Sequence, residues 1–258
     1  MLNVPLVILA GGLGTRLREE TEFRPKPMVE IGGVPIIWHI MKYYSTWGVN
    51  EFIICTGYKG EAIKNYFLNY GANHSDVTLK IGINPSYVIH QKPLEDWKVT
   101  VIDTGSLTPT GGRLLKIKNF IQTSYFFCTY GDGVANVDIS KLTELHLNSN
   151  ATATVTAVKP MSRFGVLEIG ENGNVKKFRE KPRLDTWVNG GYFAFNYEIF
   201  NSLTLETVLE QEPLVNLSQK GKLSAYKHDG FWQPMDTLRE AQFLNTLWDR
   251  DEAEWKTW

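Results

Sequence analysis

The sequence of 258 residues has little of several features that mark other classes of protein. It holds two cysteines, Cys55 and Cys128, and each lies in an apolar run typical of a buried strand. We therefore expect two small core residues and no disulfide. The five histidines show no His-x-x-x-His spacing, which argues against a zinc centre.

Long apolar runs and an excess of charge of one sign are also missing. No stretch of about 18 uncharged apolar residues occurs, and no basic segment precedes the first short apolar run, so we expect a soluble, cytoplasmic protein without membrane contact. The formal net charge is −1 with 21% charged residues, which gives no overall field that would attract nucleic acid. Any recognition of phosphate is therefore expected to be local.

A glycine-rich turn follows the first apolar run, at residues 6–10. These five residues show no polar alternation, which is typical of a strand covered on both faces. Three glycines among residues 11–14 allow a tight turn whose N–H groups point at an anion. Thr15 and Arg16 then open a predicted helix, whose N-terminus favours the same negative charge. The sequence thus predicts a phosphate-binding turn.

Two well-known glycine loops do not fit this turn. A P-loop requires Lys-Ser or Lys-Thr after the glycines, and neither pair follows here. A dinucleotide-binding fingerprint requires a third small residue at the position that Leu17 occupies. The phosphate-binding turn is therefore expected to be of a different type.

Strand and helix patterns alternate along the chain. This alternation predicts an α/β fold with a doubly wound, mostly parallel, Rossmann-like sheet flanked by helices. Ligands bind at the carboxyl ends of the strands in such sheets, so the glycine turn and Asp132 are expected to share one cleft. The predicted strands are 4–10, 51–56, 124–129 and 151–158, and the predicted helices are 36–47, 61–70 and 139–148.

Several motifs together resemble one enzyme family. Residues 11–17 (GGLGTRL) and 25–28 (PKPM) resemble the signature of sugar-phosphate nucleotidyltransferases. Further segments resemble the branch that transfers a cytidylyl group from CTP to α-D-glucose 1-phosphate, giving CDP-glucose and pyrophosphate: 130–133 (YGDG), 180–182 (EKP), 189–191 (NGG) and 228–237 (HDGFWQPMDT). The resemblance implies such an enzyme, and relatives of this kind are often homo-oligomers.

The expected organisation is one nucleotidyltransferase domain over residues 1–258. Its nucleotide-binding part covers roughly residues 1–135, and its sugar-binding and C-terminal part covers roughly residues 136–258. Short strand patterns at 166–169, 175–178 and 192–195 suggest a smaller β-rich lobe that closes over the sugar. Tryptophans in the last residues are expected to dock on the protein's own core or on a neighbouring subunit.

The reaction brings two polyanions together, so cations and a metal ion are expected in the cleft. Arg16 and Lys26 suit the catalytic role of holding and neutralising the triphosphate. Asp132 and Asp236 are the candidate ligands for Mg²⁺, which takes one or two protein carboxylates. A turn-forming Asp132 and a helix-capping Asp236 are the structural alternatives. The full set of expected nucleotide-binding residues is Leu9, Ala10, Gly11, Gly12, Gly14, Thr15, Arg16, Lys26, Thr110, Arg113 and Asp132.

Base and sugar recognition rest on two further motifs. In the segment 110–114 (TGGRL) the glycines permit close approach of the backbone to a base, and Arg113 could donate to cytosine. A helix-entry turn with a surface arginine is the alternative. The resemblance assigns the sugar and its phosphate to Glu180, Lys181, Asn189 and Gly190. Two other functions stay open: transfer of a different nucleotide, such as UTP or dTTP, or to a different sugar, and a non-catalytic regulatory relative.

Overall fold

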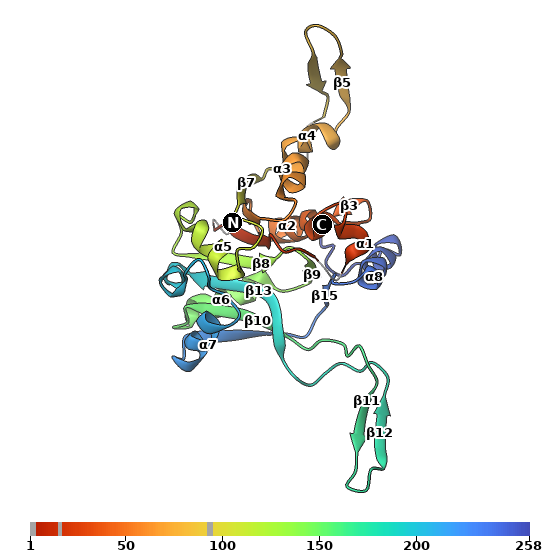
Figure 1. Cartoon of the computed structure of the whole chain (residues 1–258), viewed down its shortest axis with the longest axis vertical. Coiled ribbons are helices and arrows are strands. Elements are labelled where there is room, and N and C mark those ends of the chain that lie inside the picture. The colour runs from red at the N-terminus through yellow and green to blue at the C-terminus, as the bar shows by residue number, and fades with distance from the viewer. Residues whose placement is uncertain (1–3, 15–16, 92–94) are drawn as a thin grey trace.

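The computed structural model describes residues 4–14, 17–91 and 95–258. Its centre is a seven-stranded sheet (Figure 1). The strands are β1 (Leu6–Ala10), β4 (Glu51–Thr56), β7 (Lys98–Asp103), β8 (Tyr125–Tyr130), β10 (Ala153–Val158), β13 (Val188–Asn196) and β14 (Leu223–His228). They lie in the order β14-β10-β13-β8-β1-β4-β7.

The sheet is mostly parallel because β13 alone among these strands runs against its neighbours, β8 and β10. All five residues of β1 are buried, as expected for an apolar strand between two layers. The parallel pairing of β1 with β8 sets Leu9 opposite Tyr130. These findings confirm the predicted α/β fold class.

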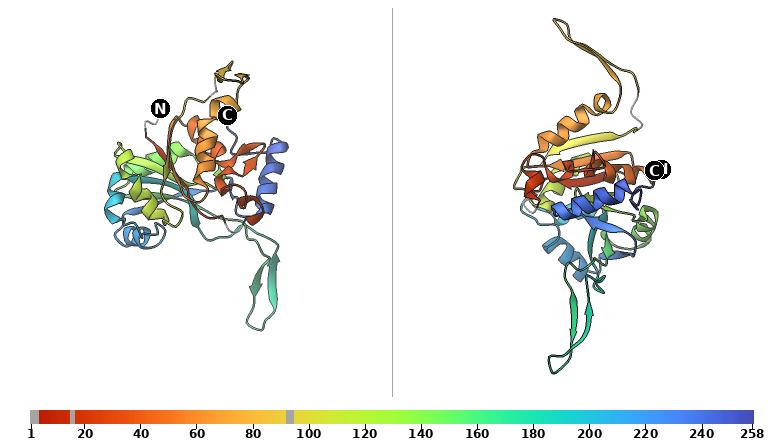
Figure 2. Two further views of the ribbon diagram at one scale, coloured as in Figure 1. Left: turned by 45° about the horizontal axis from the view of Figure 1, so that its top comes forward. Right: turned by 90° about the vertical axis from the view of Figure 1, so that its right-hand side faces the viewer.

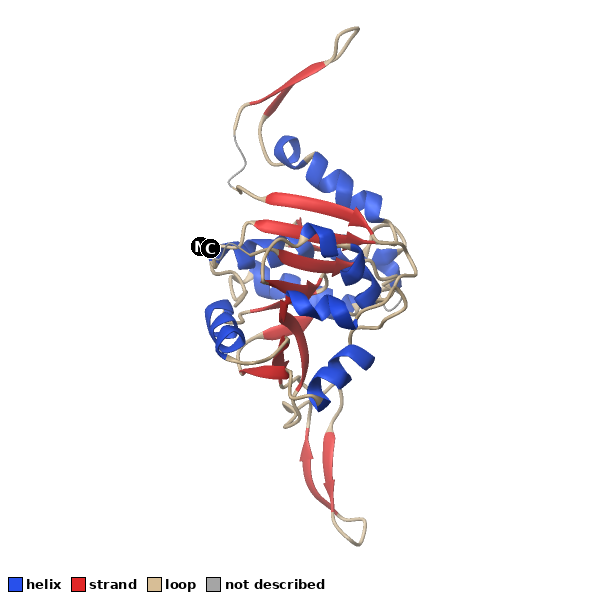
Figure 3. Ribbon diagram, turned by 90° about the vertical axis from the view of Figure 1, so that its left-hand side faces the viewer, coloured by secondary structure: helices blue, strands red, loops and turns tan. Residues whose placement is uncertain are grey.

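Helices cover both faces of the sheet (Figures 2 and 3). Alternate side chains of β1 enter two separate cores: Leu6 and Ile8 on one face, Val7 and Leu9 on the other. The helices are α1 (Arg18–Thr21), α2 (Ile36–Thr46), α3 (Gly60–Leu68), α4 (Tyr70–Asn73), α5 (Thr110–Lys116), α6 (Ile139–Asn148), α7 (Glu212–Gln219) and α8 (Leu238–Asp249), with 3-10 turns η1 (Lys26–Met28), η2 (Lys118–Phe120) and η3 (Tyr197–Ser202).

Two hairpins project from the body as arms (Figure 1). One is formed by β5 (Val77–Lys80) and β6 (Ser86–Ile89), the other by β11 (Val166–Ile169) and β12 (Val175–Arg179). The expected β-rich lobe is thus a two-stranded arm and not a packed lobe, because the third expected strand belongs to β13 of the central sheet. Two short ribbons complete the fold: β2 (Glu30–Ile31) with β3 (Val34–Pro35), and β9 (Gly133–Ala135) with β15 (Trp232–Pro234).

The C-terminal segment packs on the protein's own core. Trp255 is fully buried, and the ring of Trp258 lies 5.6 Å from that of Trp38 in α2. Of the two expected sites for these tryptophans, the structure shows the first. Cys55 and Cys128 are free and buried, as predicted. No helix in the described part of the chain is long and apolar enough to cross a bilayer.

Candidate active site

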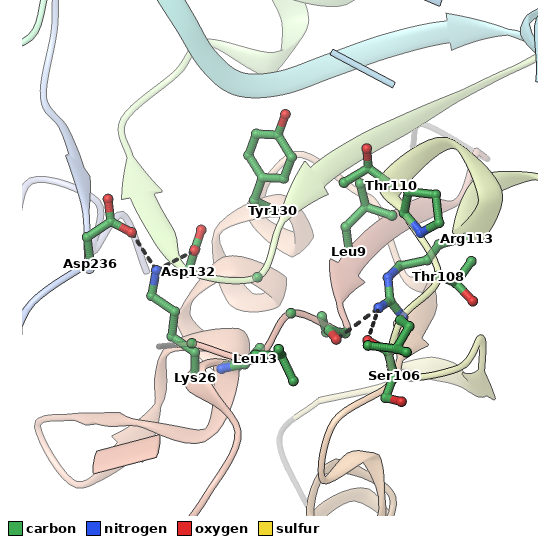
Figure 4. Close-up of a pocket in the computed structure, with 18 residues that line it drawn as sticks. Leu9, Leu13, Lys26, Ser106, Thr108, Thr110, Arg113, Tyr130, Asp132 and Asp236 are labelled. Carbon is green, nitrogen blue, oxygen red and sulfur yellow. Dashed lines mark hydrogen bonds and ion pairs between the residues drawn. The ribbon is translucent and has the colours of Figure 1, made fainter. Parts of the chain in front are cut away.

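A cleft of about 490 Å³ lies at the carboxyl edge of the sheet, where β1 and β8 end side by side (Figure 4). The N–H of Gly131 donates to the carbonyl oxygen of Leu9 at 3.1 Å, which fixes the glycine turn next to Asp132. The predicted convergence of the two motifs is therefore present. The cleft is lined by Leu9, Ala10, Gly11, Gly12, Leu13, Gly14, Lys26, Pro27, Ser106, Leu107, Thr108, Pro109, Thr110, Arg113, Tyr130, Gly131, Asp132 and Asp236.

The glycines of the turn differ in whether a larger residue would fit there, and for what reason. Gly14 has a φ of +63°, a conformation that other residues rarely adopt. A Cβ on Gly11 would lie 1.9 Å from the guanidinium of Arg113, whereas a Cβ on Gly12 would meet nothing within 4 Å. Thr15 and Arg16 lie outside the described residues, so their expected roles stay predictions.

Lys26 holds the two aspartates of the cleft together. Its Nζ lies 2.6 Å from Asp132 Oδ2 and 2.6 Å from Asp236 Oδ1 (Figure 4). Pro25 and Pro27 flank it and restrict the backbone of η1, with Pro25 at φ −67°. Burial acts to lower the pKa of Lys26, but the charge of Asp132 and the hydrogen bonds to both aspartates outweigh it and raise the pKa.

Backbone pairing brings the two aspartates close although they are distant in sequence. Asp132 follows β8, and Asp236 follows β15, whose Pro234 pairs with Gly133. The N–H of Met235 donates to the carbonyl oxygen of Asp132 at 2.7 Å. The structural alternative for Asp236 is not what the structure shows, because Thr237 caps α8 in a reciprocal capping box with Glu240.

This pair of carboxylates fits a magnesium ion. Mg²⁺ typically takes one or two protein carboxylates and completes its shell with phosphate oxygens and water. The residues that the structure describes contain no cluster of three or more His, Cys, Asp or Glu side chains, so no cage built from the protein alone is in view. Asp132 and Asp236 face the same ammonium, and a cation at that place would have two carboxylate ligands.

The side chain of Arg113 is buried and its guanidinium is hydrogen-bonded to several segments of the chain. Its Nη1 donates to the carbonyl oxygen of Thr56 and to Thr104 Oγ1, at 2.9 and 2.7 Å. Its Nη2 donates to the carbonyl oxygens of Gly11 and Ser106, at 2.9 and 3.3 Å. Of these partners, Gly11 and Ser106 line the cleft. A helix does begin at Thr110, but Arg113 is buried, so the alternative of a surface arginine is wrong. Its expected contact with the base stays a prediction.

The two glycines of the segment 110–114 serve packing, which corrects the expectation of an approach to the base. The N–H groups of Gly111 and Gly112 both donate to the carbonyl oxygen of Thr207, at 3.0 and 3.2 Å. A Cβ on Gly112 would lie 2.2 Å from the carbonyl oxygen of Leu205. A larger residue would therefore push away the loop before α7. Thr110 itself lines the cleft.

A second cavity of about 240 Å³ adjoins the first and shares Tyr130, Asp132 and Asp236 with it. Its other lining residues are Thr129, Gly133, Asn189, Gly190, Gly191, Tyr192, Trp232 and Pro234. Asn189 and Gly190 thus line a cavity that is continuous with the lining of the first. Glu180 and Lys181 are not among the lining residues. They lie at the base of the β11–β12 arm with half of each side chain exposed, paired with each other at 3.4 Å.

Sequence reasoning assigned no role to three residues in or beside the cavities. Tyr130 stands directly before the Gly-Asp-Gly motif and lines both cavities. Trp232 belongs to the C-terminal motif, and its Nε1 donates to the carbonyl oxygen of Gly190 at 2.7 Å. Both belong to segments that the sequence analysis recognised as motifs, 130–133 and 228–237, and that membership was the signal. Glu210, which accepts a hydrogen bond from Tyr130, belongs to no recognised motif.

Fold and site together give an α/β sheet with two adjoining cavities at one edge and the carboxylates of Asp132 and Asp236 at their junction. The sequence matches the nucleotidyl transferase family over residues 6–232. The chain belongs to this family, which confirms the prediction of a nucleotidyltransferase.

Within the family, the chain has high identity to proteins named as cytidylyltransferases. Glucose-1-phosphate cytidylyltransferases from Salmonella typhi and Salmonella typhimurium are each 51% identical to this chain, over 98% of it and 98% of their own length. This confirms the branch to which the motifs pointed. The crystal structure of HddC from Yersinia pseudotuberculosis shares the fold, with a TM-score of 0.69 and 24% identity over 95% of this chain and 99% of its own.

Proposed function

We propose that this protein transfers the cytidylyl group of CTP to α-D-glucose 1-phosphate and releases pyrophosphate, forming CDP-glucose. The observation that carries the proposal is the near-full-length similarity to glucose-1-phosphate cytidylyltransferases. The two adjoining cavities, with Asp132 and Asp236 at their junction, agree with a reaction between two bound phosphates.

The chemistry needs no covalent intermediate on the enzyme. An oxygen of the sugar phosphate attacks the α-phosphorus of CTP, and the bond from that phosphorus to the bridging oxygen of the leaving pyrophosphate breaks. The attacking oxygen is already ionised at neutral pH, so positioning and stabilisation of charge suffice. Both reactants are anions, and their mutual repulsion is the main barrier for the protein to lower.

The first cavity is assigned to CTP. The N–H groups of the glycine turn, Lys26 and Arg16 would hold the triphosphate, and Lys26 is already within the cleft. Asp132 and Asp236 would hold Mg²⁺, which when bound neutralises phosphate charge and polarises the attacked phosphorus. Enzymes of this family typically use a divalent metal ion, and the paired carboxylates support magnesium here.

The second cavity is assigned to glucose 1-phosphate. Asn189 and Gly190 line it and would contact the hexose. Glu180 and Lys181 stand outside both cavities, so their proposed contact with the sugar phosphate requires the base of the β11–β12 arm to move toward the cleft. A positive φ of 44° at Lys181 marks the backbone at this place as strained.

One domain carries both cavities in this proposal. The nucleotide-binding part, roughly residues 1–135, and the sugar-binding part, roughly residues 136–258, share a single sheet through the pairing of β8 with β13.

A homo-oligomer is proposed as well. The β5–β6 arm and its turn expose large apolar side chains, which favours a second copy of the chain as their cover: Leu79, Ile81, Ile83, Tyr87 and Val88.

The test is release of pyrophosphate by the purified protein with Mg²⁺ and glucose 1-phosphate. CTP, UTP, dTTP, ATP and GTP are compared one at a time. Release that is selective for CTP supports the proposal. Release with another nucleotide would reassign the base, and no release with any of them would favour a non-catalytic relative or another sugar phosphate.

A further inference from the structure

One carboxylate, that of Glu210, reaches both cavities through hydrogen bonds. Its Oε2 accepts from Thr110 Oγ1 at 2.6 Å, and its Oε1 accepts from the hydroxyl of Tyr130 at 2.6 Å. Thr110 lines the first cavity and Tyr130 lines both. Glu210 itself lies in the loop before α7 and lines neither cavity. All three side chains are half-buried.

These bonds fix the direction of the Thr110 hydroxyl. A carboxylate accepts hydrogen bonds and has none to give, so Thr110 must donate its proton to Glu210. The oxygen of Thr110 also accepts from the N–H of Leu209 at 2.9 Å. A hydroxyl has one proton and two lone pairs. Toward a ligand in the first cavity, Thr110 can therefore act as a hydrogen-bond acceptor and not as a donor.

The same carboxylate orders the second cavity through Tyr130. The hydroxyl of Tyr130 donates to Glu210 and accepts from Asn189 Nδ2 at 3.3 Å. The amide oxygen of Asn189 in turn accepts from the N–H of Gly191 at 2.8 Å. Burial and the charge of Glu210 both raise the pKa of Tyr130, which keeps this hydroxyl protonated. The amide of Asn189 is thus held in one orientation at the proposed sugar site.

We propose that Glu210 is a positioning residue that selects the base: it holds Thr110 as an acceptor, which pairs with the amino group of cytosine and leaves the carbonyl of uracil or thymine without a donor. The proposal rests on CTP as the proposed substrate. Cytosine carries a donor amino group where uracil and thymine carry an acceptor oxygen. A site built around one acceptor disfavours the analogue that presents another, because both lone pairs would then stay unpaired.

The variant Glu210→Gln changes the contact with Thr110 and keeps the contact with Tyr130. The glutamine oxygen can still accept from Tyr130, but its amide group donates to Thr110, whose own proton is then free to face the cavity. We expect the ratio of kcat/KM for CTP to that for UTP to fall about tenfold or more, with little change in the KM for glucose 1-phosphate. Glu210→Ala and Tyr130→Phe each remove the hydrogen bond between Tyr130 and Glu210. We expect both variants to raise the KM for glucose 1-phosphate about five- to tenfold.

Three controls keep the effect distinct from a loss of stability. Glu212→Gln changes an exposed carboxylate two residues away and should leave the ratio unchanged. Loss of folded protein lowers the apparent kcat but alters neither the ratio between two nucleotides nor a KM. A melting curve of each variant measures such a loss directly. In a Thr110→Ala background, Glu210→Gln should have no further effect on the ratio, because its route to the base is gone.

The outcomes separate this inference from the proposed function. A CTP-selective wild type whose selectivity survives Glu210→Gln would overturn the inference alone. An additive effect of Glu210→Gln in the Thr110→Ala background would overturn it too, since Glu210 would then act by another route. A wild type that prefers a nucleotide without an amino group at this position of the base would overturn both.

Discussion

The ammonium of Lys26 lies 2.6 Å from the carboxylate of Asp236, although 210 residues separate them in the chain. The same ammonium lies 2.6 Å from Asp132, so one positive charge holds together the C-terminal ribbon and the end of β8. The two carboxylates proposed to bind a metal ion thus contact the side chain that is proposed to bind the triphosphate. In the proposed function, binding of both ligands would require Lys26 to exchange its aspartate partners for phosphate oxygens.

We expect Lys26→Met to lower kcat for pyrophosphate release by about 10²- to 10³-fold, the usual cost of removing one group that stabilises transition-state charge. Its effect on metal binding has the opposite direction. Without the competing ammonium, Mn²⁺ should bind more tightly to the nucleotide-free protein, as measured by electron paramagnetic resonance. Lys220→Met, at an exposed position after α7, is the control. Unchanged or weaker Mn²⁺ binding in Lys26→Met would contradict competition between the two cations.

We expect Asp236→Asn to lower activity about 100-fold or more at a fixed Mg²⁺ concentration, because the neutral amide is a poorer ligand for a hard cation. A titration with Mg²⁺ should recover part of the loss, since Asp132 remains. Asp249→Asn removes an exposed carboxylate at the end of α8 and should behave as wild type. Equal Mg²⁺ dependence of Asp236→Asn and wild type would remove Asp236 from the metal site.

The glycine turn offers a matched pair of substitutions. A Cβ on Gly11 would overlap the guanidinium of Arg113, whereas one on Gly12 would meet no atom within 4 Å. Gly11→Ala should therefore cost about 1–3 kcal/mol of stability as an overpacked substitution, and Gly12→Ala much less. Urea unfolding of the two variants measures the difference. Similar midpoints would mean that Arg113 leaves its four partners at little cost.

The sequence predicted part of the fold, and the position of Asp132 within it, from short stretches of chain. Burial on both faces of β1 follows from residues 6–10 alone, and the helix at 139–148 begins and ends where α6 does. The placement of Asp132 beside the glycine turn follows from the rule for parallel strands. Each of these inferences needs a short stretch of chain and a general rule of packing.

Other features depend on contacts between distant segments. The glycines at 111 and 112 are required by the carbonyl oxygens of Leu205 and Thr207, and no local pattern announces that contact. Glu210 lies 100 residues from Thr110 in a loop without a motif. The sequence pattern of the β11–β12 arm is the same for strands that pack on the body and for strands that project from it. It therefore predicted the strands but not their position relative to the body.

The β5–β6 arm is the proposed contact between copies of the chain. Ile81 and Ile83 are 91% and 100% exposed, and an isolated hairpin of this kind is marginally stable in water. We expect Ile81→Asp with Ile83→Asp to lower the mass measured by light scattering after gel filtration. Asn84→Asp adds a charge in the same turn without removing apolar area and is the control. An unchanged mass for the double variant would place the contact elsewhere.

His39 is expected to make the protein sensitive to acid. The ring is fully buried. Its Nε2 lies 2.8 Å from the carbonyl oxygen of Ile31, and its Nδ1 accepts from Trp255 Nε1 at 3.3 Å. The first nitrogen therefore carries the proton and the second carries none. A second proton on Nδ1 would face the N–H of Trp255, so the folded state resists protonation of the ring.

Burial lowers the pKa of His39 from 6.5 to about 4. Between these values the unfolded chain binds the proton and the folded protein does not, so the free energy of unfolding falls as the pH drops from 6.5 toward 4. The loss assigned to this one ring is roughly 3 kcal/mol. Urea midpoints of the wild type and of His39→Gln, measured across this range, isolate it because the carboxylates that titrate there are common to both proteins. The wild type should lose more stability than the variant, and parallel curves would show that the ring is protonated without cost.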